Sequence, residues 1–279
     1  MEKYSVLMSL YKKEKPEYLR TALDSMINQT VKPDEIILVE DGPLTDELYH
    51  VLKEYGEHLT RVVNEKNMGL GLSLAKGLVL CRNELVARMD TDDISISNRC
   101  EMQIKYFEEN KDKAIVGGQI AEFIGDASKV VGIREVPCKD EKIREYIKKR
   151  CPFNHMSVMF RKSDVLEAGN YQNFFCNEDY YLWITMALMG KKFANLPEIL
   201  VKVRVGNEMY MRRGGRKYYE SEKDIQKYML ENQLISKGRF LINILERFVV
   251  QLLLPNRLRA LVFKNFARNK NGRKYECNR

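Results

Sequence analysis

Apolar residues in the first third of the chain follow two alternating patterns. Short apolar runs of the kind that form buried strands occur at Ser5–Leu10, Glu35–Val39, Arg61–Val63 and Leu85–Met89. Between these runs, apolar residues recur every three or four positions after Pro16, Thr45 and Met68, as in amphipathic helices. Strands that alternate with helices at this spacing predict an α/β fold, with a mostly parallel central sheet flanked by helices.

The second half of the chain has a less regular pattern. Asn177 opens a strong helix that ends at Gly190. Before it we expect shorter elements, including a strand pair with its turn at Gly125-Asp126, and after it one more strand. The predicted elements are a helix over Gln103–Phe107, strands at Ile115–Gly118 and Ser157–Phe160, a strand pair within Ile120–Val136, a helix at Ile143–Ile147 and a strand at Val201–Val205.

The pattern changes again near the C-terminus, and we expect a catalytic domain at residues 1–230 followed by an amphipathic helical tail at 231–279. Apolar residues of the tail fall at helical spacing on both sides of Pro255: Phe240, Leu241, Ile244, Leu245, Phe248, Val249 and Leu252 before it, then Leu258, Leu261, Val262 and Phe266. Residues 237–279 contain 11 Lys or Arg and 2 Asp or Glu, while the other 236 residues contain 36 basic and 37 acidic residues. The net charge of +8 therefore belongs to the tail.

A basic helix with an apolar face is typical of a helix that lies in an anionic membrane surface. The alternative is a helical hairpin that packs on the domain or on a second subunit, and we favour the membrane. Nucleic acid is disfavoured because the charges are mixed with aliphatic residues and no binding motif is present. There is no secretory signal and no apolar stretch of about 20 residues that could span a bilayer. The six cysteines have no spacing typical of a zinc site. We expect a cytoplasmic protein on the inner face of the membrane, and its oligomeric state stays open.

Three carboxylates, Asp90, Asp92 and Asp93, follow the apolar run at Leu85–Met89. Like charges this close repel by about 1 kcal/mol per pair in water and by roughly 4 kcal/mol in a partly buried site. A divalent cation would remove that cost, and two carboxylate oxygens with room for water and phosphate suit Mg²⁺ or Mn²⁺. The alternative is an Asp-rich turn in which Asp93 or Ser95 caps a helix that begins near Ile96.

Polar residues also follow the two earlier strands of the predicted sheet. Ser9 and Tyr11 lie at the end of the first strand, and Glu40 and Asp41 at the end of the second. The carboxyl ends of parallel strands meet at one edge of a sheet, where ligands bind in such folds. This convergence favours the metal site over the capped turn. The pair Gly69-x-Gly71 lacks the third glycine of a dinucleotide-binding motif and does not follow the first strand, so a Rossmann oxidoreductase is disfavoured.

Further candidate residues lie in the second half. Glu178 and Asp179 open the helix after Asn177, where acidic residues are common because they face the positive end of the helix dipole. Buried neighbours such as Trp183 would instead place a carboxylate at a pocket edge, with a raised pKa and a stronger pull on an alcohol proton. The segment Arg204–Tyr219, with Arg212 and Arg213, is either a loop that closes over a diphosphate or a solvated surface loop. His155 is more often a structural histidine than a ligand or acid.

Five segments in order resemble glycosyltransferase family 2, whose members are inverting enzymes with the GT-A fold. They are SVLMSLYK, ILVEDG, NEKNMGLGLSLAKGL, MDTDD and NEDYYLW, and the similarity spans roughly residues 3–220. The later segments CPFNHMSVMFRKS, NLPEIL and RVGNEMYMRRGG resemble the bacterial branch that builds surface polysaccharides.

The resemblance implies roles for the residues named above. Ser9, Tyr11, Glu40 and Asp41 would surround the uracil or ribose of a nucleotide-sugar, and Lys66 and Asn67 would lie along the nucleotide. The family pattern at the second strand is usually two aspartates, whereas this chain has Glu40-Asp41. Lys76 stands where relatives often have asparagine.

The resemblance also implies the catalytic groups. Asp92 would bind the Mn²⁺ or Mg²⁺ directly, with Asp90 nearer the ribose and sugar. Asp179 would be the general base, and Glu178 its neighbour in the acceptor pocket, for which His155, Trp183, Arg212 and Arg213 are further candidates. The expected function is transfer of a hexose, galactose or glucose, from a UDP-sugar to a polyprenyl-diphosphate-linked saccharide in O-antigen, capsule or exopolysaccharide synthesis. The alternatives are a nucleotidyltransferase acting on sugar phosphates and a non-catalytic, membrane-associated nucleotide-binding scaffold.

Overall fold

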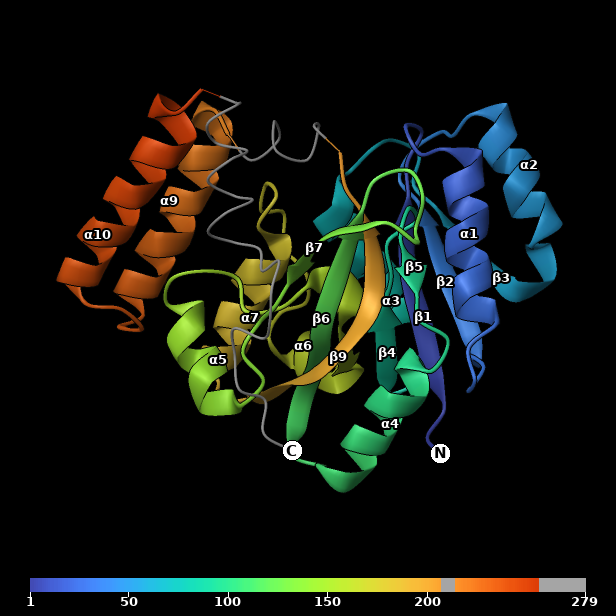
Figure 1. Cartoon of the computed structure of the whole chain (residues 1–279), viewed down its shortest axis with the longest axis horizontal. Coiled ribbons are helices and arrows are strands. Elements are labelled where there is room, and N and C mark those ends of the chain that lie inside the picture. Colours follow the sequence, from blue (N-terminus) through green and yellow to red (C-terminus); the bar gives the residue numbers. More distant parts are fainter. Residues whose placement is uncertain (207–213, 256–279) are drawn as a thin grey trace.

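The computed structural model describes residues 1–206 and 214–255 of the chain. In this part of the chain a single mixed sheet runs through the molecule, with helices on both faces (Figure 1). The strands are β1 (Tyr4–Leu10), β2 (Glu35–Glu40), β3 (Leu59–Val63), β4 (Leu85–Arg88), β5 (Ile94–Ser95), β6 (Lys113–Phe123), β7 (Val130–Arg134), β8 (Met159–Arg161) and β9 (Lys192–Arg204). The helices are α1 (Pro16–Ile27), α2 (Asp46–Glu54), α3 (Leu70–Leu80), α4 (Arg99–Glu109), α5 (Asp140–Ile147), α6 (Lys162–Glu167), α7 (Glu178–Leu188), α9 (Arg216–Glu231) and α10 (Lys237–Phe248).

The first half of the sheet is parallel, as predicted. The strand order is β3-β2-β1-β4-β8-β6-β9-β5, and β3, β2, β1 and β4 all run in the same direction. The carboxyl ends of β1, β2 and β4 therefore meet at one edge. The second half is mixed, because β8 pairs antiparallel with both β4 and β6, and β6 then pairs parallel with β9. The sheet is therefore parallel throughout its N-terminal half, as expected, and mixed beyond it, where β6 and β9 form a further parallel pair.

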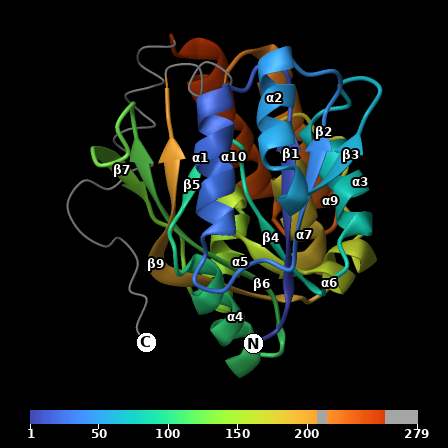
Figure 2. The same ribbon diagram turned by 90° about the vertical axis from the view of Figure 1, so that its right-hand side faces the viewer.

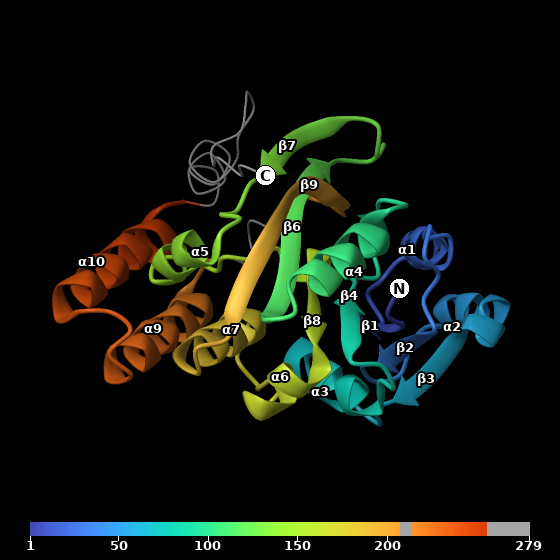
Figure 3. The same ribbon diagram turned by 90° about the horizontal axis from the view of Figure 1, so that it is seen from below.

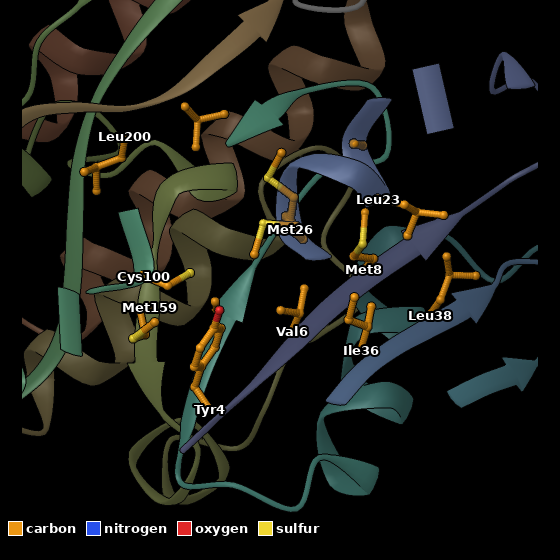
Figure 4. Packing of buried hydrophobic residues seen from close by; sticks show 14 of the residues in the cluster. Tyr4, Val6, Met8, Leu23, Met26, Ile36, Leu38, Cys100, Met159 and Leu200 are labelled. Atoms are coloured by element: carbon orange, nitrogen blue, oxygen red, sulfur yellow. The ribbon is translucent and has the colours of Figure 1, made fainter. Parts of the chain in front are cut away.

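The central strands are buried on both faces, which explains their continuous apolar runs. On β1, Val6 and Met8 point to one core, while Leu7 points to the other. Helices α1, α2 and α4 cover the first face, and α3, α5, α6 and α7 cover the second (Figure 3). Figure 4 shows the first core, where Tyr4, Val6 and Met8 of β1 lie beside residues of β2 and α1.

Two elements near the acidic cluster differ from the prediction. The chain after Asp93 forms β5, which pairs with β9, and the next helix begins only at Arg99. Asp93 accepts a hydrogen bond from the backbone N–H of Arg204, so it caps no helix. The capped-turn alternative is therefore wrong. The predicted strands within residues 115–136 are one long strand, β6, and its antiparallel partner β7.

Helices α9 and α10 lie side by side at one end of the molecule, and α1 and α2 lie at the other (Figures 1 and 2). The contact between α9 and α10 includes buried polar groups. Asn243 of α10 is buried and donates to Gln226, and Arg247 forms an ion pair with Glu222, at 2.5 Å between Nε and Oε2. Leu241, Ile242 and Leu245 of α10 are exposed, whereas the ring of Phe248 contacts Tyr219 of α9. The division of the chain at residue 230 falls at the end of α9 and stays a prediction.

Candidate active site

The loop after β2 is organised by Asp41, which is 5% exposed. Its carboxylate accepts hydrogen bonds from the backbone N–H groups of Met68 and Gly69, at 2.6 and 3.1 Å, and from the side-chain amide of Asn67 at 2.7 Å. The turn that carries Asn67 packs so closely on Gly42 that a Cβ there would lie 2.7 Å from a backbone nitrogen. Asp41 and Asn67, both predicted nucleotide-binding residues, are therefore held together.

The other residues predicted at this edge have different surroundings. Glu40 is 1% exposed and is bonded to Nε of Arg61 on β3 at 2.6 Å. Ser9 is half-buried near the end of β1, whereas Tyr11 and Lys66 are exposed at the rim. Glu40 therefore has a structural partner already, and contacts of these four residues with a nucleotide stay predictions. Lys76, at the position where relatives often have asparagine, donates to the backbone of Val63 and to the side chain of Asn64.

The three carboxylates after β4 converge in a tight turn. One oxygen from each of Asp90, Asp92 and Asp93 lies within 4.8 Å of the others. Asp90 and Asp92 are half-buried and so remain open to a ligand, whereas Asp93 is 1% exposed. Three clustered oxygen ligands, two of them accessible, suit a hard cation such as Mg²⁺ or Mn²⁺ that keeps other positions for water and phosphate.

The electrostatics of this turn favour a cation. Burial, with the neighbouring charges of Asp90 and Glu14, raises the pKa of Asp92 to about 7. Burial and the charges of Asp92 and Asp90 raise the pKa of Asp93 well above its usual range. Burial also raises the pKa of Glu14, whose carboxylate accepts a hydrogen bond from Thr91 within the turn. The carboxylates thus retain protons that a bound cation would displace.

Arg204, at the end of β9, holds this turn in place. Its backbone N–H donates to Asp93, and its Nε donates to the backbone carbonyl of Asp92 at 3.2 Å. The guanidinium lies 3.7 Å from the ring centroid of Tyr18 on α1. The sequence suggested a loop from Arg204 to Tyr219, but Arg204 belongs to β9 and residues from Arg216 onward belong to α9. The predicted loop residues Arg212 and Arg213 lie outside the described residues.

Arg88 was missed by the sequence analysis, and its charge acts both on the acidic turn after β4 and on two carboxylates at the start of α7. The side chain, 2% exposed, forms an ion pair with Asp90, at 2.6 Å between Nη2 and Oδ1. Among the residues that the structure describes, Nε and Nη1 have no partner. Its charge also acts on Asp92, Glu178 and Asp179. A basic residue inside an otherwise apolar strand, directly before an acidic motif, was the signal available in the sequence.

Glu178 and Asp179 form the second acidic group, at the N-terminus of α7. The fold brings them near the first strands because α3 packs closely here: a Cβ on Gly71 would lie 3.0 Å from the Cβ of Glu178. Burial and the neighbouring Asp179 raise the pKa of Glu178 to about 7. Burial also raises the pKa of Asp179, although hydrogen bonds from the Tyr180 N–H and the Cys151 thiol oppose this. A carboxylate with a raised pKa is suited to general-base catalysis.

Two acceptor-site candidates have mainly structural surroundings. His155 is hydrogen-bonded through Nε2 to the Tyr171 hydroxyl at 2.9 Å, and burial lowers its pKa well below the usual range. Trp183 is fully buried among aromatic rings that include Phe153 and Tyr171. Trp183 is therefore a core residue of α7 and does not line a pocket surface. The contacts of His155 fit the structural histidine that the sequence favoured.

Comparison with known proteins identifies the family. Residues 5–166 match the model of glycosyl transferase family 2. This chain belongs to that family. It is 42% identical over 270 residues to an uncharacterised glycosyltransferase of Haemophilus influenzae, with 95% of this chain and 99% of the relative covered.

Two relatives have more informative names. The amylovoran biosynthesis glycosyltransferase AmsE of Erwinia amylovora is 42% identical over 84% of this family 2 chain and 88% of its own length. An Escherichia coli enzyme named UDP-Gal:alpha-D-GlcNAc-diphosphoundecaprenol beta-1,3-galactosyltransferase is 38% identical over 95% of this chain and 97% of its own. The chain is therefore a glycosyltransferase, and its similarity to enzymes of polysaccharide synthesis agrees with the predicted branch.

Solved structures confirm the GT-A fold. Staphylococcus aureus TarS 1–349 in complex with UDP-GlcNAc superposes with a TM-score of 0.66 at 19% identity, covering 88% of this chain and 72% of TarS 1–349. A mannosyltransferase from Pyrobaculum calidifontis in complex with GDP-Man and Mn²⁺ gives a TM-score of 0.64 at 15% identity, covering 96% of this chain and 76% of the mannosyltransferase. Within the described ranges, no helix has the length and apolar character to cross a bilayer.

Binding of Mn²⁺ at Asp92 is expected to raise the melting temperature of the protein, and more at about pH 8 than at about pH 6. In the unfolded chain Asp92 ionises near pH 4, but in the fold it stays protonated up to about pH 7, so without a cation stability falls as the pH rises through this window. Asp92→Asn should remove most of the Mn²⁺ effect. Thermal-shift titrations measure the change in melting temperature with Mn²⁺. The control is Asp126→Asn, at an exposed carboxylate on the β6–β7 turn. Equal Mn²⁺ shifts in Asp92→Asn and the wild type would place the cation elsewhere.

Replacing Arg204 with Lys should weaken Mn²⁺ binding while the fold persists. Lysine keeps the charge but loses the planar group that donates to the Asp92 carbonyl and stacks on Tyr18, so the turn becomes looser. The expected loss of Mn²⁺ affinity is about 10-fold, typical for a group that orients metal ligands. The same titration measures the Mn²⁺ affinity. The matched control is Arg20→Lys, because Arg20 forms an exposed ion pair with Glu54. Unchanged affinity in Arg204→Lys would mean that the turn needs no such support.

Proposed function

We propose that this protein is an inverting hexosyltransferase that transfers galactose or glucose from a UDP-sugar to a polyprenyl-diphosphate-linked saccharide. The proposal includes a role in O-antigen, capsule or exopolysaccharide assembly, at the cytoplasmic face of the membrane. It rests on family membership and on the name of the E. coli relative, which specifies a UDP-galactose donor and an acceptor linked to diphosphoundecaprenol.

The observation that carries the proposal is the placement of two acidic groups around one buried arginine. Asp90 and Asp92 at the end of β4 are suited to hold a cation and the donor diphosphate. Glu178 and Asp179 at the start of α7 are suited to take a proton. Arg88 contacts Asp90 and acts electrostatically on both α7 carboxylates, which supports the proposal that the two groups border one site.

The reaction is a single displacement at the anomeric carbon. Asp179 takes the proton of the acceptor hydroxyl, whose oxygen attacks the anomeric carbon from the side opposite the diphosphate. The bond between that carbon and the diphosphate oxygen breaks, its electron pair stays on the oxygen, and UDP leaves. Attack from the opposite side inverts the configuration at the anomeric carbon.

The surrounding residues prepare this step. A divalent cation at Asp92 and Asp90, when bound, would neutralise the negative charge that develops on the leaving diphosphate. Arg204 fixes the turn that carries both carboxylates. The Tyr180 N–H and the Cys151 thiol each donate to one oxygen of Asp179, which keeps the carboxylate oriented. Burial raises the pKa of Asp179 and so makes it a stronger base once ionised.

The two alternatives are less favoured. A nucleotidyltransferase would need a glycine- and lysine-rich loop after the first strand, and the segment Tyr11–Lys15 contains no glycine. A non-catalytic scaffold would not need to retain the acidic groups at Asp90, Asp92 and Asp179. Family membership also favours glycosyl transfer over both alternatives.

The roles of Asp179 and Asp92 are tested by measuring sugar transfer from radiolabelled UDP-galactose or UDP-glucose to a GlcNAc-diphospho-lipid acceptor in the presence of Mn²⁺. Asp179→Asn should reduce transfer by about 10²-fold to 10⁴-fold because the general base is lost, while UDP binding persists. Asp92→Ala should reduce both transfer and the slow hydrolysis of the UDP-sugar, because the diphosphate loses its cation. Asp112→Asn, a half-exposed carboxylate of the α4–β6 loop, is the matched control. An Asp92→Ala variant with the wild-type hydrolysis rate would contradict the proposal.

Peripheral membrane association is also part of the proposal, and α10 supports it. Leu241, Leu245 and Leu253 of α10 and the following turn η3 (Val249–Leu253) are 66, 64 and 60% exposed. Ile242 and Phe248 extend this apolar face. Soluble helices usually bury such a stripe, but α10 buries Asn243 and half-buries Arg247 instead. An exposed apolar helix face beside basic residues suits insertion into an anionic lipid surface.

The double variant Leu241→Asp/Leu245→Asp should lose binding to vesicles of phosphatidylglycerol and phosphatidylcholine, because charged groups cannot enter the apolar layer of the surface. Co-sedimentation measures the bound fraction, which should also fall with added salt in the wild type. Leu80→Asp, at a half-exposed leucine that ends α3, is the control and should bind as the wild type does. If the double variant binds vesicles normally but changes from dimer to monomer in gel filtration, the apolar face pairs two copies of the chain and the membrane role is wrong.

A further inference from the structure

Cys151 lies directly beside the proposed catalytic base. It is a half-buried residue in the segment between α5 and β8, and its Sγ lies 3.4 Å from Oδ2 of Asp179. Oδ1 of Asp179 accepts the backbone N–H of Tyr180 at 2.7 Å. Each carboxylate oxygen therefore has one donor from the protein and retains lone pairs for a substrate hydroxyl.

The position of the thiol is itself fixed by neighbouring contacts. Arg134 of β7 donates from Nη2 to the backbone carbonyl of Cys151 at 3.0 Å. Asn195 of β9 donates to the carbonyl of the next residue, Pro152, at 3.2 Å. The segment that carries the thiol is thus tied to two strands of the sheet. The thiol has two acceptors within reach, Oδ2 of Asp179 at 3.4 Å and the backbone carbonyl of Phe153 at 3.6 Å, and the carboxylate is both the nearer and the charged one.

We propose that Cys151 is a positioning residue for the reaction: its thiol donates a hydrogen bond that fixes the Asp179 carboxylate and keeps it ionised for the acceptor hydroxyl. This inference rests on the proposed role of Asp179 as the base. It assigns no chemistry to the sulfur, which forms and breaks no covalent bond. The thiol acts only as a donor to the reacting carboxylate.

The charged surroundings are consistent with a thiol that stays protonated. Burial and the adjacent Asp179 charge raise the pKa of Cys151 well above its usual range, so the sulfur keeps its hydrogen. The groups that face Asp179 are Arg134 of β7, Arg88 of β4, Tyr171, and Glu178 of its own helix. The two arginines and the thiol favour the ionised carboxylate, while burial opposes it. Removing the thiol is therefore expected to favour the protonated form of Asp179.

The test compares the pH dependence of kcat/KM in Cys151→Ala, Cys151→Ser and the wild type. The acidic limb reports ionisation of the Glu178–Asp179 pair in the free enzyme. In Cys151→Ala this limb should move upward by about half a pH unit to one unit, because a hydrogen bond to the ionised form is lost. Serine retains a donor, so Cys151→Ser should lie closer to the wild type. Cys176→Ser, at an exposed cysteine before α7, is the control and should leave the limb in place.

The S–H stretching band gives a second measurement that does not depend on activity. The infrared difference between the wild type and Cys151→Ala isolates this thiol, and its band should lie at lower frequency in the wild type than in Asp179→Asn. An unshifted band, or an acidic limb that is the same in all three proteins, would overturn the role of Cys151. Lower activity with an unchanged limb and a lower melting temperature would show that Cys151 only fills space, which also overturns it. If Asp179→Asn itself retains transfer, the proposed base is wrong, which is a different failure from that of Cys151.

Discussion

Mutual repulsion among buried carboxylates is the constraint on which the active site depends. Asp90, Asp92 and Asp93 lie within one turn, and Glu178 and Asp179 lie nearby at the start of α7. Arg88 is a buried positive charge that pairs with Asp90 and acts on both groups. Burial, together with a repulsion among five acids that one guanidinium cannot offset, raises the pKa values of Asp92 and Glu178 to about 7. A cation and a substrate bound as proposed would relieve this charge, and without them the acidic groups lower the stability of the fold.

The sheet makes this concentration of charge possible. Parallel strands β1, β2 and β4 bring three separate loops to one edge, and the mixed second half adds Arg204 from β9 and Asp179 from α7. Gly71 allows α3 and α7 to approach closely, and Gly42 allows the turn of residues 64–69 to reach Asp41. Each glycine thus brings together residues far apart in the sequence. The course of the backbone therefore determines which residues meet at the site.

Much of the first half was predictable because its signals are local. Helix α1 begins at Pro16 and α2 begins directly after Thr45, as the sequence indicated, and the apolar runs coincide with β1, β2 and β4. The acidic residues were predictable for the same reason. The supporting contacts of Cys151 and Arg204 were not predictable, because they join residues that are far apart in the sequence and meet only in the fold. Arg204 looked like part of a basic loop, and only its pairing register in β9 places it against Asp92 and Asp93.

The polar attachment of α10 has a geometric consequence for the whole molecule. Apolar side chains packed together tolerate small rotations and shifts, but hydrogen bonds weaken steeply when their angle changes. Asn243 bonds to Gln226 and to the carbonyl of Lys148, and Arg247 bonds to Glu222 and to the carbonyl of Lys149. These contacts fix both the roll and the position of the helix on its neighbours. A surface that binds the outer side of α10 is therefore held in one orientation relative to the rest of the protein. Its distance from the sheet edge where the strands end is fixed as well.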